Sequence, residues 1–132
     1  MSSDIEIPPV LTLAAGLVGM PDSKTLDVIP IADGDFVELA DRDEPALGWL
    51  AAAADDVRAG ITDRLRKSGR IGTDEVVLVL LASHGEPPVV TANLAGPIVV
   101  APDGAARQLI LEGPDFELRA RLSRLAPSPA NG

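Results

Sequence analysis

The residue types that most often carry out chemistry are scarce in this sequence. It contains no cysteine, which excludes a thiolate nucleophile, a disulfide bond and a cysteine metal site. His84 is the single histidine, and a catalytic triad would need Ser83 or another serine beside it, together with a carboxylate. Because His84-Gly85-Glu86-Pro87 has the composition of a loop, we expect a connection there and not a catalytic base.

Three acidic residues, Asp41, Asp43 and Glu44, lie close together in the sequence. Carboxylates can bind a hard cation, but the spacing lacks the glycine and the distal glutamate of a calcium-binding EF-hand loop. We therefore expect a solvated acidic loop whose three side chains are exposed.

Two other patterns could bind phosphate or nucleic acid. Gly16-x-x-Gly19 has no third glycine and no helix pattern after it, so it is not a phosphate-binding loop. The basic cluster has no aromatic residues between its members for base stacking, and it fits the solvated face of a helix (Arg58, Arg64, Arg66, Lys67 and Arg70). Since no nucleophile has both a base and an orienting group, we expect a non-enzymatic protein without metal or cofactor.

The net charge of −9 is unevenly distributed along the chain. Residues 1–56 hold twelve acids against Lys24 and Arg42, a net charge of −10, whereas residues 57–132 hold eight acids and nine bases, a net charge of +1. Nucleic acid is a poor partner for such a surface, because phosphate binding needs a basic patch. Two interpretations stay open: a basic protein partner, or charge that serves only solubility.

The bulk composition predicts one folded domain. Hydrophobic residues make up 46% of the 132 residues, which is enough to bury one core. The first residues lack the basic segment of a signal peptide, and the longest apolar run, residues 76–82, is too short to span a bilayer. We expect a cytoplasmic protein with no membrane partner, monomeric when free, with a single domain over residues 1–125 and a flexible tail at 126–132.

Short apolar runs separated by turn residues predict a mainly β fold, a small antiparallel barrel or sandwich. Asp33-Gly34 between two such runs is a hairpin signal, and Pro102-Asp103-Gly104 predicts another turn. The run at 75–82 is apolar on both faces, which predicts a strand buried on both sides. The expected strands are 10–14, 26–31, 36–39, 46–51, 75–82, 89–94, 97–101 and 107–112, with a last short element at 116–122.

One short helix is expected near residues 55–68. Val57, Ile61 and Leu65 recur every four residues along one face, and Gly69 provides a stop. Gly60 in its interior lowers the helix propensity.

The C-terminal half carries a more specific pattern. Thr91-Ala-Asn-Leu-Ala-Gly-Pro-Ile-Val-Val-Ala, followed by Arg107-Gln-Leu-Ile-Leu, resembles the signature of the FliW family of flagellar assembly factors. The matching positions are Asn93, Leu94, Pro97, Ile98, Gln108 and Leu111, and Asp115-Phe116-Glu117-Leu118-Arg119 is similar to the segment that follows in the family. Gly16-Leu17-Val18-Gly19-Met20 and Phe36-Val37-Glu38-Leu39 resemble its N-terminal motifs, so the resemblance covers residues 10–122. The sequence departs from the family pattern at Met20, Ala40, Asp41, Gly96, Val100 and Ala101.

The resemblance implies a mainly antiparallel β-barrel-like fold and two alternating partners. One is flagellin, and the other is CsrA, a small basic translational repressor whose capture relieves repression of flagellin synthesis. The candidate partner-binding residues are Asn93, Leu94, Pro97, Ile98, Gln108, Asp41, Asp43 and Glu44.

The signature residues also have a structural interpretation. Asn93 could bond loop backbone at a strand end, Gln108 could satisfy groups of a neighbouring strand, and Pro97 could protect a sheet edge. A protein-interaction module with a different partner, and a small enzyme or ligand-binding barrel, stay open as alternatives, since a fold does not fix a function.

Overall fold

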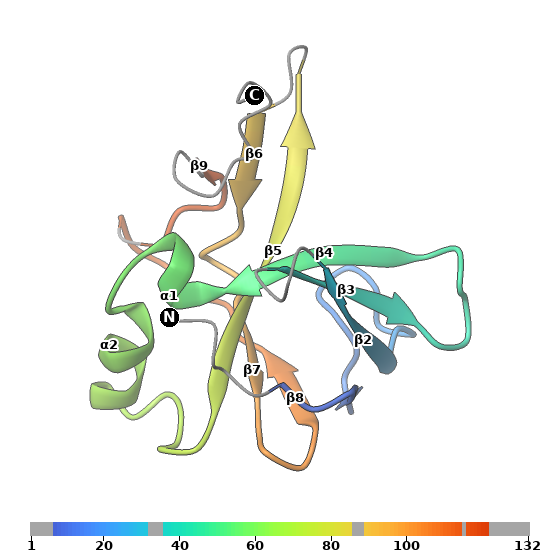
Figure 1. The fold of residues 1–132 in the computed structure, drawn as a ribbon. Helices are drawn as coiled ribbons and strands as arrows, with labels where there is room; N and C mark the ends of the chain where they lie inside the picture. The colour runs from blue at the N-terminus through green and yellow to red at the C-terminus, as the bar shows by residue number, and fades with distance from the viewer. Residues whose placement is uncertain (1–6, 32–35, 86–88, 115, 122–132) are drawn as a thin grey trace.

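The computed structural model describes residues 7–31, 36–85, 89–114 and 116–121. Within these residues the chain forms nine strands and two short helices (Figure 1). The strands are β1 (Val10–Leu13), β2 (Thr25–Ile31), β3 (Phe36–Asp41), β4 (Gly48–Ala53), β5 (Val76–His84), β6 (Val89–Ala92), β7 (Ile98–Val100), β8 (Ala105–Gln108) and β9 (Ala120–Arg121). The helices are α1 (Ala54–Val57) and α2 (Ile61–Lys67), and within the described chain neither is long and apolar enough to cross a membrane.

The sheet closes into a barrel, as predicted. The strand order in the described sheet is β4-β3-β2-β1-β8-β7-β5-β6-β9. The first seven strands of this order form a closed barrel, because β4 at one end also pairs with β5 at the other. Closure pairs β4 with β5 and so removes two open edges, while β9 stays at the edge of the described sheet. The described barrel is mainly antiparallel, as the resemblance implies, but β1 and β8 pair in parallel, with Thr12 opposite Ala105.

The long strand β5 joins the parts of the fold. It pairs with β7 over Val76–Leu78, with β4 over Leu78–Leu81 and with β6 over Leu81–His84. Where β4 turns away, the β5–β6 pair continues as an arm that projects from the barrel (Figure 1).

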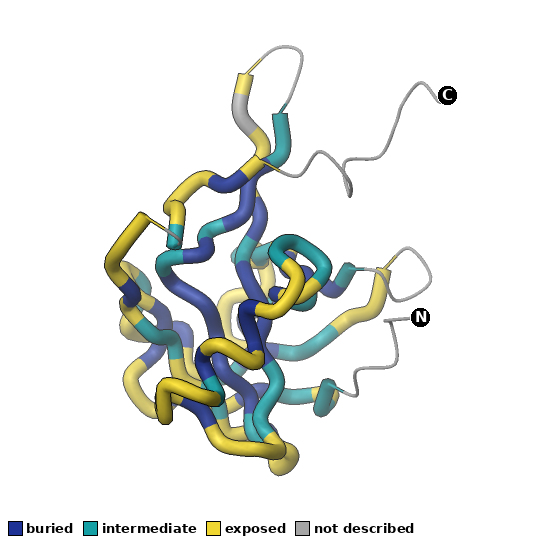
Figure 2. The backbone as a smooth tube through the Cα atoms, turned by 90° about the vertical axis from the view of Figure 1, so that its left-hand side faces the viewer, coloured by how far each residue is buried: buried dark blue, intermediate teal, exposed yellow. Residues whose placement is uncertain are grey.

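Both faces of β5 are buried because two separate cores lie against them. Leu78 points into the barrel, whose interior core also holds Leu11, Leu13, Leu26, Leu39 and Ile98. Val77, Val79 and Leu81 face outward against the two helices, in a second core with Ile61, Leu65, Leu94 and Leu111. Figure 2 shows the buried residues running through the central strands between these two layers. The predicted double burial is confirmed for Val77, Leu78, Val79 and Leu81, whereas Val76 and Leu80 are half-buried because each lines a surface hollow.

The helix expected near residues 55–68 is broken in two. Gly60 adopts φ = 86°, a left-handed conformation that an α-helix cannot continue through, and α2 begins after it. Oδ1 of Asp55 accepts a hydrogen bond of 3.0 Å from the backbone N–H of Thr62, so the first helix caps the second. Ile61 and Leu65 are buried and Gly69, with φ = 82°, ends the second helix, as the sequence indicates.

The C-terminal third is less regular than predicted. The turn at residues 102–104 forms, with Gly104 N–H donating to the carbonyl of Ala101 at 2.9 Å, but the following strand ends at Gln108. The backbone N–H groups of Leu109 and Leu111 then donate to the carbonyls of Pro97 and Ala95, outside any strand. The element expected at 116–122 is present in the described residues only as the two-residue strand β9. The Asp33-Gly34 turn, the side chain of His84 and the tail at 126–132 lie outside the described residues.

Candidate functional site

Asn93 organises the turn between β6 and β7. Its Oδ1 accepts hydrogen bonds of 3.0 Å from the backbone N–H groups of both Ala95 and Gly96. An asparagine side chain that bonds backbone two and three residues ahead stabilises a turn in this way. The structural role considered for Asn93 is therefore present in the molecule.

Gln108 holds the same turn from the neighbouring strand β8. Its Nε2 donates to the carbonyl of Gly96 at 2.8 Å, and its Oε1 accepts from the backbone N–H of Val18 at 2.8 Å. One amide thus ties together three segments that are distant in sequence. We call the set Asn93, Gly96 and Gln108 the amide clasp.

Glycine at position 96 fits this clasp. A Cβ atom there would lie 2.9 Å from both Asn93 Nδ2 and Gln108 Nε2, closer than side-chain carbons ordinarily approach. The departure from the family pattern at Gly96 therefore changes the packing of two amides inside the fold.

Three signature residues are inaccessible to a partner. Leu94 and Ile98 have 0% of their surface exposed, and Pro97 is also buried. Pro97 precedes β7, which lies between β5 and β8 in the barrel, so the idea that it protects a sheet edge is wrong. Leu94 belongs to the core under the helices and Ile98 to the barrel interior, so the folded protein does not present these side chains to a partner.

Asp41 is not an exposed acid, in contrast to the prediction. It is 4% exposed, its Oδ2 accepts from the Ser23 hydroxyl at 2.7 Å, and its Oδ1 accepts from the backbone N–H groups of Asp43 and Glu44 at 3.0 and 3.3 Å. The hydrogen bond from Ser23, aided by the two amides, holds the pKa of Asp41 below its ordinary value of 3.8. A period of two along β3 places Val37, Leu39 and Asp41 on the inward face, so strand alternation is the signal from which its burial could have been predicted.

Asp43 and Glu44 are exposed, as predicted, and they border a hollow. This hollow has a volume of about 540 Å³ and combines apolar Met20, Pro21 and Leu47 with acidic Asp22, Asp43 and Glu44. We call it the acidic hollow. Its composition suits a long basic side chain, whose methylenes would contact the apolar residues while its charge meets the carboxylates.

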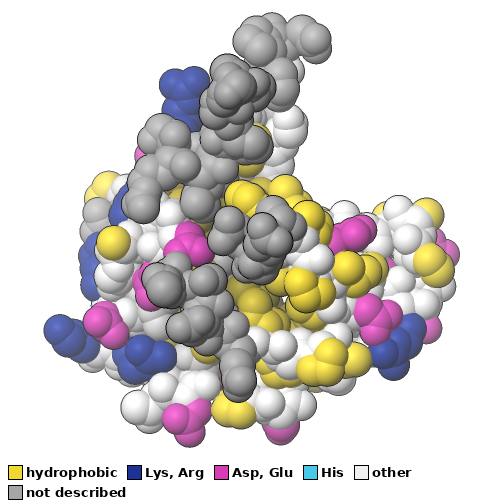
Figure 3. All heavy atoms as spheres, viewed as in Figure 1, with side chains coloured by type: hydrophobic (Ala, Val, Ile, Leu, Met, Phe, Trp, Pro, Cys, Tyr) yellow, Lys and Arg dark blue, Asp and Glu magenta, His cyan; other side chains and the backbone are white. Residues whose placement is uncertain are grey.

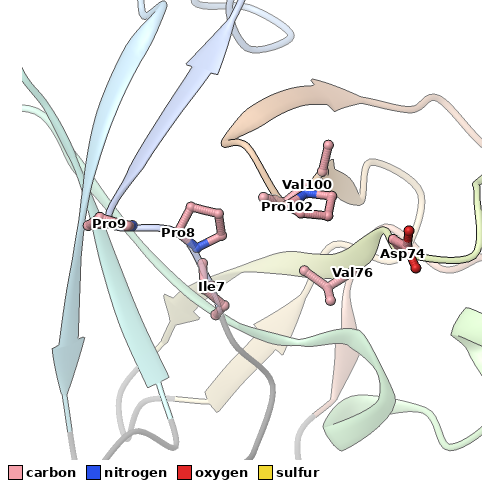
Figure 4. A pocket seen from close by; sticks show the side chains of 8 residues that line it. Ile7, Pro8, Pro9, Asp74, Val76, Val100 and Pro102 are labelled. Atoms are coloured by element: carbon pink, nitrogen blue, oxygen red, sulfur yellow. The ribbon is translucent and has the colours of Figure 1, made fainter.

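A second hollow borders the start of β5 (Figure 4). It measures about 630 Å³, and the described part of its lining is almost wholly apolar or proline, with Asp74 as the one acidic side chain among those residues. The lining residues are Ile7, Pro8, Pro9, Asp74, Val76, Val100, Ala101 and Pro102. A ligand or active site usually combines an apolar pocket with several convergent polar groups, and the described residues of this lining supply one.

The described residues also contain no group of three or more histidine, cysteine or acidic side chains that could hold a metal ion. The barrel interior is packed mainly with leucine, isoleucine and valine side chains. The described part of the molecule thus offers surface hollows as its candidate binding sites.

Comparison with known proteins agrees with this geometry. The curated flagellar assembly factor FliW of Geotalea uraniireducens (strain Rf4) is 30% identical to this chain over 125 residues, covering 88% of the chain and 76% of that protein. A crystal structure of the flagellar assembly factor FliW superposes with a TM-score of 0.68 at 24% identity, covering 89% of each chain, which establishes the likeness of fold. The profile of the FliW protein family matches residues 2–122. The chain therefore belongs to the FliW family.

Proposed function

We propose that this chain is a flagellar assembly factor that binds flagellin and a CsrA-like translational regulator in alternation, and so couples flagellin synthesis to the amount of free flagellin. The observation that carries the proposal is the 30% identity to a relative named as a flagellar assembly factor. The protein acts by binding in the cytoplasm, where translation takes place, and not as an enzyme.

The charge of the surface supports a basic regulator as one partner. Residues 1–56 carry a net charge of −10, and Asp22, Asp43 and Glu44 gather around the acidic hollow. Complementary charge accelerates encounter between proteins and disfavours partners of like charge.

Three of the six departures from the family pattern support retained partner binding, because they lie inside the fold, whereas Met20 lines the acidic hollow and Ala101 lines the hollow at the start of β5. Asp41 is buried against Ser23, Gly96 lies between two amides, and Val100 is 1% exposed in the barrel core. Changes at such positions re-pack the interior and leave the exposed surface free to keep its contacts.

Purified components test the proposal directly. Flagellin monomer and the CsrA-like protein from the same organism are each titrated against this protein by calorimetry, and then against each other in competition. We expect saturable binding of each, and displacement of the regulator when flagellin is added. Absence of binding to both partners would refute the proposal and favour the alternative, an interaction module with a different partner.

A further inference from the structure

An open sheet face lies where the β5–β6 arm leaves the barrel. β4 and β5 stop pairing at Leu50 and Leu81, while β5 continues with β6 and β6 with β9. A hollow of about 340 Å³ remains at this divergence. It is lined by Trp49, Leu80, Leu81, Ala82, Thr91, Asn93, Leu118 and Arg119, and we call it the Trp49–Arg119 face.

Strand pairing places the lining residues side by side. Ala82 pairs with Thr91, and Thr91 pairs in turn with Arg121 of β9. The backbone N–H of Asn93 donates to the carbonyl of Leu80 at 2.9 Å. Directly paired residues project to the same side of a sheet, so the face continues from the barrel onto the arm.

The face offers exposed apolar surface. Leu118 is 64% exposed, and Trp49 and Leu80 are half-buried beside it. In the view of Figure 3, hydrophobic side chains gather around the region where β4 and β5 cross. Apolar groups grouped in this way mark a binding surface more often than single exposed leucines do.

Two polar side chains of the face, Arg119 and Asn93, carry unused donors, whereas the hydroxyl of Thr91 can both donate and accept. Arg119 is exposed and forms no ion pair with any described residue, and within the described chain the Nδ2 of Asn93 has no acceptor. The acid nearest in sequence, Glu117, is already bonded to Arg58 at 2.7 Å. An arginine and an amide that present unused N–H groups are suited to a carboxylate.

We propose that the Trp49–Arg119 face docks a protein segment in which apolar side chains flank a carboxylate. The apolar side chains would contact Trp49, Leu80 and Leu118, and the carboxylate would accept hydrogen bonds from Arg119 and Asn93. The acidic hollow suits a basic partner, so the molecule would carry two docking surfaces of opposite preference. This surface does not depend on the partner identities proposed above, and either proposal can fail without the other.

Trp49 provides the readout, since it is the single tryptophan of the chain and lines the face. The probes are a short peptide that alternates leucine with glutamate, and a matched peptide with lysine in place of glutamate. We expect the glutamate peptide to change Trp49 emission saturably. The lysine peptide should leave Trp49 emission unchanged, even if it binds at the acidic hollow.

Two sets of variants, three at arginines and two at apolar residues, locate the contact. Arg119→Glu should weaken binding of the glutamate peptide about tenfold or more, whereas Arg119→Lys should retain most of it and Arg70→Glu, an exposed arginine outside the face, should retain all of it. Leu118→Ser should also weaken binding, while Ile110→Ser, at a site that is 71% exposed and outside the face, should not. Unchanged thermal melting of each variant would confirm that it is folded.

The proposal is overturned if the glutamate peptide leaves the Trp49 emission of the unmodified protein unchanged. It is also overturned if Arg70→Glu weakens binding as much as Arg119→Glu, since the effect would then come from net charge and not from this face.

Discussion

The hydroxyl of Ser23 donates a hydrogen bond of 2.7 Å to Oδ2 of Asp41, and this contact joins the segment before β2 to the end of β3. The other oxygen of Asp41 accepts from the N–H groups of Asp43 and Glu44. The three acids therefore divide into two roles: Asp41 holds the loop, and Asp43 and Glu44 present charge to solvent.

Asp41→Ala should lower the melting temperature clearly, because the Ser23 hydroxyl and two backbone N–H groups lose their acceptor. Asp43→Ala should leave it almost unchanged, since an exposed side chain away from such contacts contributes little to stability. Thermal unfolding followed by circular dichroism at neutral pH compares the two variants. Equal melting temperatures would show that the Asp41 hydrogen bonds do not stabilise the loop.

The same contact makes stability dependent on pH. Hydrogen bonds from Ser23 and the two amides lower the pKa of folded Asp41 below 3.8, so its carboxylate stabilises the fold above that pH. The contribution is lost as the pH falls through the folded value. Denaturant unfolding at a series of pH values should therefore show that the stability gap between the unmodified protein and Asp41→Asn narrows below pH 3.8. A gap that stays constant down to pH 2 would contradict a lowered pKa.

The amide clasp should show energetic coupling. Gln108→Ala removes the bonds to Gly96 and Val18 and should cost about 1 kcal/mol. Gly96→Ala should also destabilise, because the added methyl would press on both amides, but it should cost less in the Gln108→Ala background, where one of those contacts is gone. A double-mutant cycle from denaturant unfolding measures the difference. Strict additivity would mean that the clasp does not behave as a unit.

Leu78 tests the barrel core. It is 0% exposed and points into the barrel from the middle of β5. Leu78→Ala should lower the free energy of unfolding by about 2–5 kcal/mol, through lost burial and the cavity that remains. Val18→Ala, at a site that is 62% exposed, is the matched control and should shift it by less than about 0.5 kcal/mol. An unchanged denaturation midpoint for Leu78→Ala would be incompatible with a buried central strand.

The sequence allowed the strands to be predicted where the local pattern and the tertiary environment agree. The apolar run of β5 indicated burial on both faces because each face meets a different core. The parallel pairing of β1 with β8 could not be predicted, since it joins residues about ninety positions apart and no local pattern encodes it. Closure of the barrel by β4 and β5 depends on the same kind of long-range contact.

The candidate site was harder to predict than the fold. Grouping Asp41, Asp43 and Glu44 by proximity overlooked the alternation of β3, which turns Asp41 inward. Leu94 and Ile98 matched the family signature but proved to be core residues, because a family pattern records packing as well as contact. The low helix propensity of Gly60 could be read from the sequence, but the break itself could not. The left-handed conformation that separates α1 from α2 accompanies the packing of both helices against the second core.

Association with a CsrA-like regulator should be electrostatically steered through the acidic hollow. The suitable variant neutralises Asp22, Asp43 and Glu44 together and leaves the buried Asp41 intact, so the loop keeps its hydrogen bonds. We expect a slower association rate with little change in dissociation, because exposed charges act mainly on encounter. Raising the salt concentration should slow association of the unmodified protein, since the Debye length shortens from about 30 Å at 0.01 M to about 8 Å at physiological ionic strength.

Neutralising Asp63, Asp74 and Asp103, three exposed acids outside the hollow, is the matched control with the same change in net charge. Stopped-flow or surface-binding kinetics at two salt concentrations give both rates. If the hollow variant and its control slow association equally, net charge steers the partner and the hollow does not select it; if neither salt nor the hollow variant changes the association rate, the acidic surface serves solubility alone.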